Sequence, residues 1–396
     1  MSLKLENFFI EDTLEINWEF VLGLPHFSEL KKTEQNPKWH SEGNVLNHTK
    51  LVCKNMRRYI ENGKINVDEH EERLLMLSAL FHDIGKPSTT SMGKDGNLHS
   101  YGHEDAGCKI TRHMLWDWDL FDREYICNMV LNHMSPLFVH NSKNVDKKIL
   151  SMISIVPYLG LYYLKMSDMN GAIQNEEAST KAEDKKKMAD FLKRCEALTE
   201  THKIKPYIYE FKRFKTNEFI SINNCTFEEM ERYNNMKDTT PILHIMVGLP
   251  GSGKNTYIEE MKAMSMISAD AVVLSRDDIR VELGFCGEGE KIVGTEAQEK
   301  EVSKVFSNRL ARARSEGKDI VANNVSLTKK RRKAISNQLP KYLHVYHYIE
   351  APTFQDNVNR RLGQIPEKVL HDMALRFEFP EINECSLLNV YKQHAE

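Results

Sequence analysis

The stretch Gly248-Leu-Pro-Gly-Ser-Gly-Lys254 follows an apolar run, Ile242 to Val247, and opens a segment with helical periodicity. A glycine-rich turn between a strand and a helix lets backbone N–H groups and the helix N-terminus surround a phosphate. The glycines avoid a Cβ clash with the anion, and Lys254 offers a cation to the β and γ oxygens. A glycine turn without a ligand is the alternative. We expect a nucleotide-binding loop formed by Gly248, Gly251, Ser252, Gly253, Lys254, Asn255 and Thr256.

The chain after Pro241 alternates short strand-like runs with helical stretches. The runs are rich in β-branched and aromatic residues and comprise Ile242 to Val247, Ala271 to Leu274, Ile320 to Ala322 and Leu343 to Ile349. Such alternation is typical of an α/β domain with a parallel sheet. We therefore expect residues 241–396 to form an α/β domain around the glycine-rich loop.

One position of the loop departs from the usual pattern. Asn255 stands where a serine or threonine normally binds Mg²⁺, and Thr256 follows it directly. An amide oxygen binds a hard cation more weakly than the usual groups do. Three interpretations stay open: the site is slow, Thr256 takes over the role, or the loop binds nucleotide without turnover.

A second polar segment, Ser275-Arg276-Asp277-Asp278-Ile279-Arg280, follows the second expected strand. This places it at the carboxyl edge of the sheet, where α/β domains bind their ligands. A carboxylate beside a hydroxyl can act as a general base, and a guanidinium matches a phosphate. The alternative is that Asp277 and Asp278 only cap the next helix, although capping needs one carboxylate and no arginine.

The loop and the Asp277 segment together resemble the polynucleotide kinase branch of the P-loop phosphotransferases, over residues 241–380. The resemblance implies ATP and Mg²⁺ as cofactors. It also implies that Asp277 takes the proton from a 5′-hydroxyl, Lys254 contacts the transferred phosphate, and Arg280 holds an acceptor phosphate.

Two further segments extend this resemblance. Arg360 matches a lid arginine over the transferring phosphate, although spacing alone fits an exposed helix pair formed by Arg360 and Arg361 nearly as well. Asn323 and Asn324 stand in a strand-and-turn segment that is commonly acidic in the family.

Residues 1–170 show helical periodicity with few strand-like alternations. Several polar side chains fall on the apolar stripes of these helices; for example, His48 shares a stripe with Val45 and Val52, and Asp168 with Leu161. A buried carboxylate without a counter-charge is strongly unfavourable, so a cation is expected. One histidine alone would more often be a satisfied core residue, but imidazoles together with carboxylates suit transition-metal ions.

Leu80-Phe-His82-Asp83-Ile-Gly-Lys86-Pro87 closely matches the central motif of the HD superfamily of metal-dependent phosphohydrolases. The resemblance covers residues 39–170 and implies an α-helical bundle. It implies one divalent transition metal (Mn, Ni, Co, Fe or Zn) held by His48, His82, Asp83 and Asp168. A second metal would be held by Asp83, His103 and His133. His40 and Lys86 are weaker candidates for phosphate contact, with a surface role as the alternative.

The bulk composition sets limits on the protein. With 396 residues we expect two or three domains, and the polar stretch 171–240 is the expected connector. Seven scattered cysteines without a C-x-x-C pair argue against a disulfide framework or zinc ribbon. No apolar run approaches the roughly 18 residues of a membrane helix, so we expect a cytoplasmic protein without a membrane partner.

An HD phosphohydrolase followed by a polynucleotide-type kinase resembles fused end-healing enzymes. The resemblance implies RNA or DNA ends as substrates, nucleotide as a further ligand and a separate polynucleotide ligase as a partner. The net charge of −3 gives no overall attraction to nucleic acid, so binding would need local segments such as residues 329–333. Two alternatives remain: a phosphohydrolase and kinase of small metabolites, and a nucleotide-sensing regulator with a silenced kinase.

Overall fold

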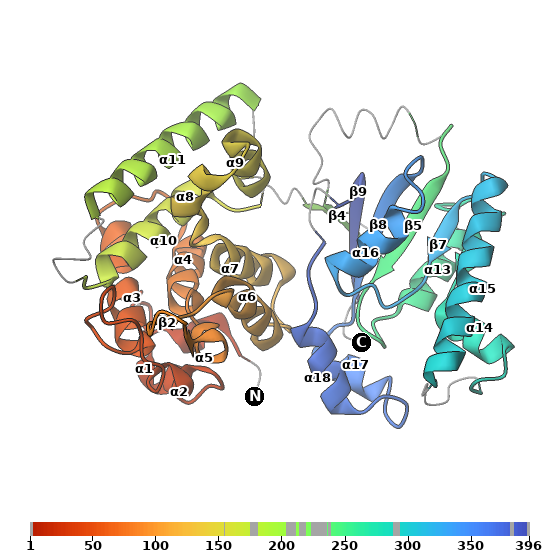
Figure 1. Cartoon of the computed structure of the whole chain (residues 1–396), viewed down its shortest axis with the longest axis horizontal. Coiled ribbons are helices and arrows are strands. Elements are labelled where there is room, and N and C mark those ends of the chain that lie inside the picture. The colour runs from red at the N-terminus through yellow and green to blue at the C-terminus, as the bar shows by residue number, and fades with distance from the viewer. Residues whose placement is uncertain are drawn as a thin grey trace. The chain divides into compact units, whose positions relative to one another are not determined.

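The computed structural model describes residues 3–153, 155–174, 181–202, 211–213, 219–222, 236, 239–287, 294–380 and 384–393. It divides the chain into two compact units, Met1–Ile208 and Tyr209–Glu396. The first unit is helical and the second is built on a sheet (Figure 1). Both expected fold classes are therefore confirmed.

The first unit is a bundle of helices with one short hairpin. Its elements are η1 (Leu5–Phe8), α1 (Trp18–Leu22), α2 (Phe27–Leu30), α3 (Val45–Glu61), α4 (Glu69–Phe81), α5 (Lys86–Thr89), β1 (Ser91–Met92), β2 (Leu98–His99), α6 (His103–Met114), α7 (Leu120–Asn132), α8 (Ser135–Phe138), η2 (Val139–Asn141), α9 (Val145–Ile153), α10 (Tyr158–Gly171) and α11 (Lys181–His202).

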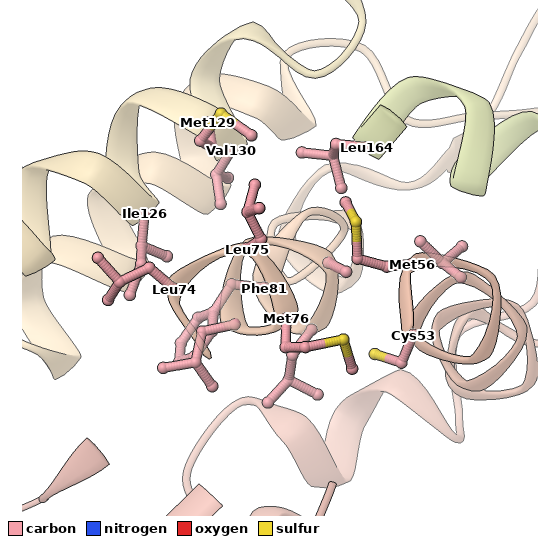
Figure 2. Packing of buried hydrophobic residues seen from close by; sticks show 14 of the residues in the cluster. Cys53, Met56, Leu74, Leu75, Met76, Phe81, Ile126, Met129, Val130 and Leu164 are labelled. Atoms are coloured by element: carbon pink, nitrogen blue, oxygen red, sulfur yellow. The ribbon is translucent and has the colours of Figure 1, made fainter. Parts of the chain in front are cut away.

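Helix α4 is the centre of this bundle. Every residue from Leu74 to Phe81 is buried, as expected for a helix that is enclosed on all sides. Figure 2 shows its side chains packed among neighbouring helices, through Cys53 and Met56 of α3, Ile126, Met129 and Val130 of α7, and Leu164 of α10. The helices that carry the polar candidates are thus fixed by packing around α4.

Side-chain caps set where these helices begin. Asn44 accepts a hydrogen bond from Asn47 N at 3.0 Å, and Asp68 accepts one from Glu71 N at 2.8 Å. Each cap satisfies a backbone N–H that has no partner inside its helix. Helices α3 and α10 approach closely at Gly171, where a Cβ atom would lie 2.9 Å from Val52 Cγ2. This close approach places Asp168 of α10 beside His48 of α3.

The second unit contains a sheet with the strand order β3-β4-β9-β8-β5-β7-β6. Its strands are β3 (Phe211–Arg213), β4 (Phe219–Ile222), β5 (Ile242–Val247), β6 (Val272–Leu274), β7 (Ile320–Ala322), β8 (Leu343–Glu350) and β9 (Leu387–Lys392). The run from β9 to β6 is parallel, and β3 and β4 add an antiparallel edge. The four expected strands are present as β5, β6, β7 and β8, whereas β3, β4 and β9 were not expected.

Among the described residues of the second unit, six helices lie in the sequence between the parallel strands. They are α13 (Lys254–Ala263), α14 (Arg276–Glu282), α15 (Glu296–Ser315), α16 (Lys329–Ser336), α17 (Phe354–Asn359) and α18 (Glu367–Leu375). The helical ribbons and the parallel strands alternate along the chain, as the colours of Figure 1 show. The loop at Gly248 joins the central strand β5 to α13.

The expected connector, residues 171–240, contains ordered elements of both units. Helix α11 belongs to the first unit, and strands β3 and β4 belong to the second. Part of the connector, including residues 175–180 and 223–235, lies outside the described residues. Its boundaries stay a prediction.

Among the described residues, no single helix is long and apolar enough to cross a membrane. The helices Val145–Ile153 and Tyr158–Gly171 reach that length and apolar composition only when they are taken together, and the chain bends by 104° between them.

Candidate metal centre and phosphate-binding loop

The six metal-ligand candidates of the first unit converge in its interior. All are buried, with exposed fractions of 8% or less for His48, His82, Asp83, His103, His133 and Asp168. Several lie at helix ends: His82 follows α4, His103 begins α6 and His133 follows α7. The structure therefore brings together all six residues that the sequence selected.

The Nδ1 atoms of three histidines point away from the centre. Each lies 2.7–2.8 Å from a backbone carbonyl three residues earlier, in the pairs His82 with Ala79, His103 with Ser100, and His133 with Val130. Ala79 and Val130 belong to the last turns of α4 and α7, where carbonyls lack a helical donor. A carbonyl accepts only from an N–H, so each Nδ1 carries the hydrogen and each Nε2 presents a lone pair to the centre.

These lone pairs face one another without a hydrogen between them. Nε2 of His103 and Nε2 of His133 lie 3.2 Å apart, and burial lowers the pKa of both side chains, which keeps them neutral. Nε2 of His82 is buried and has no hydrogen-bond partner among the described residues. A divalent cation would satisfy all three nitrogens, so the residues present fit a metal.

Asp83 lies between two groups of nitrogens. Its Oδ2 is 3.2 Å from His82 Nε2 and 3.7 Å from His48 Nε2, and its Oδ1 is 3.4 Å from His103 Nε2 and 3.9 Å from His133 Nε2. Burial acts to raise the pKa of Asp83, but His82 and Lys86 outweigh it and hold the pKa well below its usual range. The ionised carboxylate can therefore bridge two cations.

Asp168 completes one side of the centre. Its Oδ1 lies 3.0 Å from His48 Nε2, and its Oδ2 accepts a hydrogen bond from Lys165 Nζ at 2.6 Å. Burial acts to lower the pKa of His48, but its contacts with Asp168 and Glu42 raise it to about 9. Each ring nitrogen of His48 therefore lies beside a carboxylate, Nδ1 beside Glu42 and Nε2 beside Asp168.

Glu42 and Lys165 are residues of this centre that the sequence analysis missed. Glu42 Oε1 lies 2.7 Å from His40 Nδ1 and 2.9 Å from His48 Nδ1, while Oε2 accepts from Ile173 N at 2.9 Å. Burial acts to raise the pKa of Glu42, but these contacts outweigh it and lower the pKa. The sequence offered one signal, a carboxylate two residues after His40 and shortly before the helix that carries His48.

Lys86 belongs to the interior and not to the surface. Its Nζ lies 2.7 Å from Asp83 Oδ2 and donates to Gln35 Oε1 at 2.7 Å, and the residue is 8% exposed. Its charge offsets that of Asp83. His40 is partly exposed and packs edge-on against His48.

In the second unit, the glycine-rich loop has the backbone that its sequence predicts. A Cβ atom on Gly248 would lie 2.3 Å from Ile349 O, and Gly253 has a φ of +91°, in the left-handed region. Only glycine fits either position without strain. The loop therefore keeps the open curvature that a phosphate would occupy.

Lys254 bends back onto this loop. Its Nζ donates to Gly248 O at 3.0 Å and to Leu249 O at 2.7 Å. Burial lowers the pKa of Lys254 to about 7, and nearby Arg361 lowers it as well. Phosphate oxygens would offer the ammonium group a stronger partner than these carbonyls, so bound phosphate would raise the pKa.

Arg360, the expected lid arginine, lies against the loop. Its Nη1 donates to Gly251 O at 3.1 Å and also to Gln393 Oε1. The contact joins α17 to the phosphate loop across more than a hundred residues of sequence. The structure therefore places Arg360 where a guanidinium can reach the anion, and its role over a transferring phosphate stays a prediction.

Asp277 in the first turn of α14 is paired with Arg280 in its last turn. Arg280 Nη1 donates to Asp277 Oδ1, while Nε and Nη2 donate to Glu299 of α15 at 2.7 Å and 2.9 Å. The cap of α14 is Ser275, whose side chain accepts from Asp278 N at 3.2 Å. Asp277 and Asp278 are thus not the capping side chains, and the structure disfavours that alternative.

The two departures from the kinase pattern contact each other. Asn323 Nδ2 donates a hydrogen bond to Asn255 Oδ1 at 2.9 Å. Both side chains are neutral, and neither offers the hydroxyl or carboxylate oxygen that Mg²⁺ prefers. The residues present do not fit a Mg²⁺ ion held by these two positions, and the expected Mg²⁺ stays a prediction.

The basic segment at residues 329–333 is only partly available to a ligand. Arg332 is fully buried and forms a double hydrogen bond with Glu384 at 2.8 Å and 2.9 Å. Its charge is therefore paired with that of Glu384 in the interior of the fold. Lys330, Arg331 and Lys333 are exposed.

Comparison with protein families assigns both units. Residues 45–153 match the HD domain family, and residues 243–380 match an AAA domain family. The chain joins an HD domain to a P-loop kinase-like domain. A comparison with curated proteins found no similar sequence.

The two matched ranges differ in how many of the candidate site residues they include. The match to the HD domain includes His48, His82, Asp83, His103 and His133 but ends before Asp168. The match to the kinase-like domain includes Lys254, Asp277, Arg280 and Arg360. The domain assignment supports phosphohydrolase and kinase chemistry in general, and the role of each residue stays a prediction.

Proposed function

We propose that this protein is an RNA or DNA end-healing enzyme. In this proposal the HD domain removes a 2′,3′-cyclic, 2′- or 3′-phosphate, and the kinase-like domain uses ATP to phosphorylate a 5′-hydroxyl. Both products are the ends that a polynucleotide ligase joins, so we expect the protein to act in the cytoplasm with a separate ligase.

The pair of Asp277 and Arg280 carries the proposal for the kinase-like domain. A carboxylate that can accept a proton from a hydroxyl is held next to a guanidinium that can hold a phosphate. An acceptor that carries a hydroxyl and a phosphate close together matches this pair. The 5′ terminal nucleotide of a strand, with its own 3′ phosphodiester, is such an acceptor.

Arg280 would have to exchange partners to reach that acceptor. Its Nε and Nη2 are held by Glu299, and the hydrogen bond from Arg280 is the main cause that lowers the pKa of Glu299 to about 2. Its Nη1 group donates to Asp277 Oδ1. Glu299 therefore fixes the direction of the guanidinium, and acceptor phosphate would compete with Asp277 for Nη1.

The HD domain contributes a buried, preformed set of ligands. When bound, divalent metal lowers the pKa of a coordinated water and stabilises charge on a phosphoryl group. The protein holds Nε2 of His82, His103 and His133 in the correct direction through their backbone contacts. Lys86 and Lys165 neutralise Asp83 and Asp168, which lowers the cost of gathering these carboxylates.

One observation favours a second candidate function, a nucleotide-sensing regulator with a silenced kinase. Asn255 of the loop and Asn323 after β7 offer neither a hydroxyl nor a carboxylate to a metal, and they hydrogen-bond to each other. In that case the kinase-like domain would bind nucleotide without transferring phosphate.

A doubly labelled oligonucleotide separates these functions. The substrate carries a 5′-hydroxyl and a 2′,3′-cyclic phosphate and is incubated with the full protein, ATP and a panel of divalent metals. The proposal expects loss of the cyclic phosphate and gain of a 5′-phosphate. Hydrolysis without 5′ phosphorylation under every metal would favour the regulator. The absence of both reactions would contradict the end-healing function.

A further inference from the structure

We infer that the phosphate loop of the kinase-like domain binds a nucleoside triphosphate as the free anion, without a divalent cation held by the protein. The inference rests on the proposed function and deepens it by naming the ionic form of the nucleotide. It follows from the two asparagines at the metal position of the loop and from the cations that surround it.

The two asparagines meet because of the strand order. Strand β7 runs parallel to β5, with Ala322 opposite Ile245. The residue after β7, Asn323, therefore lies at the same edge of the sheet as the loop that follows β5. Asn255 occupies the first turn of α13, and its Oδ1 accepts from Asn323 Nδ2 at 2.9 Å.

The contact changes what this position offers to a ligand. A hydroxyl or carboxylate would present lone pairs to a hard cation, whereas the single side-chain oxygen of Asn255 is neutral and already uses one of its two lone pairs to accept a hydrogen bond. The remaining polar group of Asn255 is an NH₂ group, which can only donate. Such a group favours a phosphate oxygen and disfavours a cation.

Positive side chains provide the charge that a metal would otherwise supply. Lys254 Nζ lies on the loop carbonyls, and Arg360 Nη1 donates to Gly251 O at 3.1 Å. Arg361 is close enough to Lys254 to lower its pKa. Three cations around one loop suit a multiply charged anion that arrives without its own counter-ion.

Equilibrium binding of ATP to the full protein tests the inference without any nucleic acid. Affinity is measured by calorimetry in excess chelator and again in excess Mg²⁺. For the unmodified protein we expect the two dissociation constants to agree within about threefold, a difference of less than ~1 kcal/mol.

Two substitutions together should make ATP binding depend on Mg²⁺. In the double variant Asn255→Ser with Asn323→Asp, a hydroxyl and a carboxylate return to the position, so Mg²⁺ should tighten ATP binding by about tenfold relative to chelator. Asn324→Asp is the matched control. It adds the same charge one residue away, at a side chain that accepts from Arg276 N and does not contact Asn255, so it should leave the metal dependence unchanged.

The outcomes separate the inference from the proposed function. Binding by the unmodified protein that is more than about tenfold tighter in Mg²⁺ would overturn the inference while leaving nucleotide use intact. Equal metal dependence in the double variant Asn255→Ser with Asn323→Asp and in the Asn324→Asp control would overturn the assignment to the asparagine pair. No ATP binding in either condition would contradict the proposed kinase function itself.

Discussion

The HD centre and the phosphate loop differ in whether their polar atoms find partners within the protein. In the HD domain, buried histidine nitrogens without hydrogens face one another or lack a partner among the described residues, and an added cation would satisfy them. In the kinase-like domain, Asn255 and Asn323 satisfy each other, while positive side chains gather around the loop. Unsatisfied lone pairs therefore indicate a metal site more directly than a sequence motif does.

The largest expected effect comes from removing the bridging carboxylate. Asp83→Ala should abolish phosphoester hydrolysis and metal binding, because both groups of nitrogens lose their shared counter-charge. Kinase activity on a 5′-hydroxyl oligonucleotide should persist. Lys254→Ala is the reciprocal variant and should lose kinase activity only. Loss of both activities in either variant, with an unchanged circular dichroism spectrum, would contradict independent sites.

Glu42→Gln should have the next largest effect. The substitution keeps the size of the side chain but removes the charge that holds Nδ1 of His48, and outer partners of this kind typically change metal affinity by about 10–100-fold. Metal titration of the chelator-treated protein measures the change. Glu104→Gln is the control, since Glu104 is more exposed and lies 3.4 Å from His103 Nδ1, which already has a backbone partner. An unchanged metal affinity in Glu42→Gln would show that Glu42 does not act on the metal centre.

A pH dependence of nucleotide binding is expected from Lys254. Its pKa is about 7 in the free loop, and bound phosphate raises it, so binding takes up a proton. Affinity should be greatest below pH 7 and fall by up to about tenfold per pH unit above it, until the pKa of the complex is reached. Lys254→Arg stays charged and should give a flat profile over this range. A flat profile in the unmodified protein would contradict the lowered pKa.

The smallest expected effect concerns the exposed basic residues of α16. Arg331→Ala should weaken oligonucleotide binding modestly and reduce the dependence of log K on log salt by about one phosphate contact, roughly 0.7–0.9 in slope. Binding is measured at several salt concentrations. An unchanged slope would remove this helix from the nucleic-acid surface. Arg332→Ala is not a suitable comparison, because Arg332 is buried in its pair with Glu384.

Motifs with short spacing could be predicted from the sequence. A few adjacent residues are enough to indicate the local backbone and chemistry of three segments: the central His82-Asp83 motif, the loop from Gly248 to Lys254 and the segment around Asp277. The polar residues on apolar stripes, such as His48 and Asp168, could be predicted because burial of charge is costly. The structure brings the HD-domain candidates together and places the loop and the Asp277 segment at the ends of β5 and β6, while the role of each residue stays a prediction.

Contacts between distant segments could not be predicted in this way. Glu42 joins the HD centre through contacts with His48 and Ile173, and Arg280 is held by Glu299 of another helix. Neither contact leaves a periodic signal. Strand β9 was missed because its place depends on pairing with β8, and the hydrogen bond between Asn255 and Asn323 depends on the order of β5 and β7.

Elemental analysis of the purified protein tests the central claim most directly. The account predicts about two divalent transition-metal ions per chain in the HD domain, which would be held by His48, His82, Asp83, His103, His133 and Asp168. Both should be lost in Asp83→Ala and both retained in Lys254→Ala. A metal-free protein that stays folded and still hydrolyses phosphoesters in excess chelator would contradict the account.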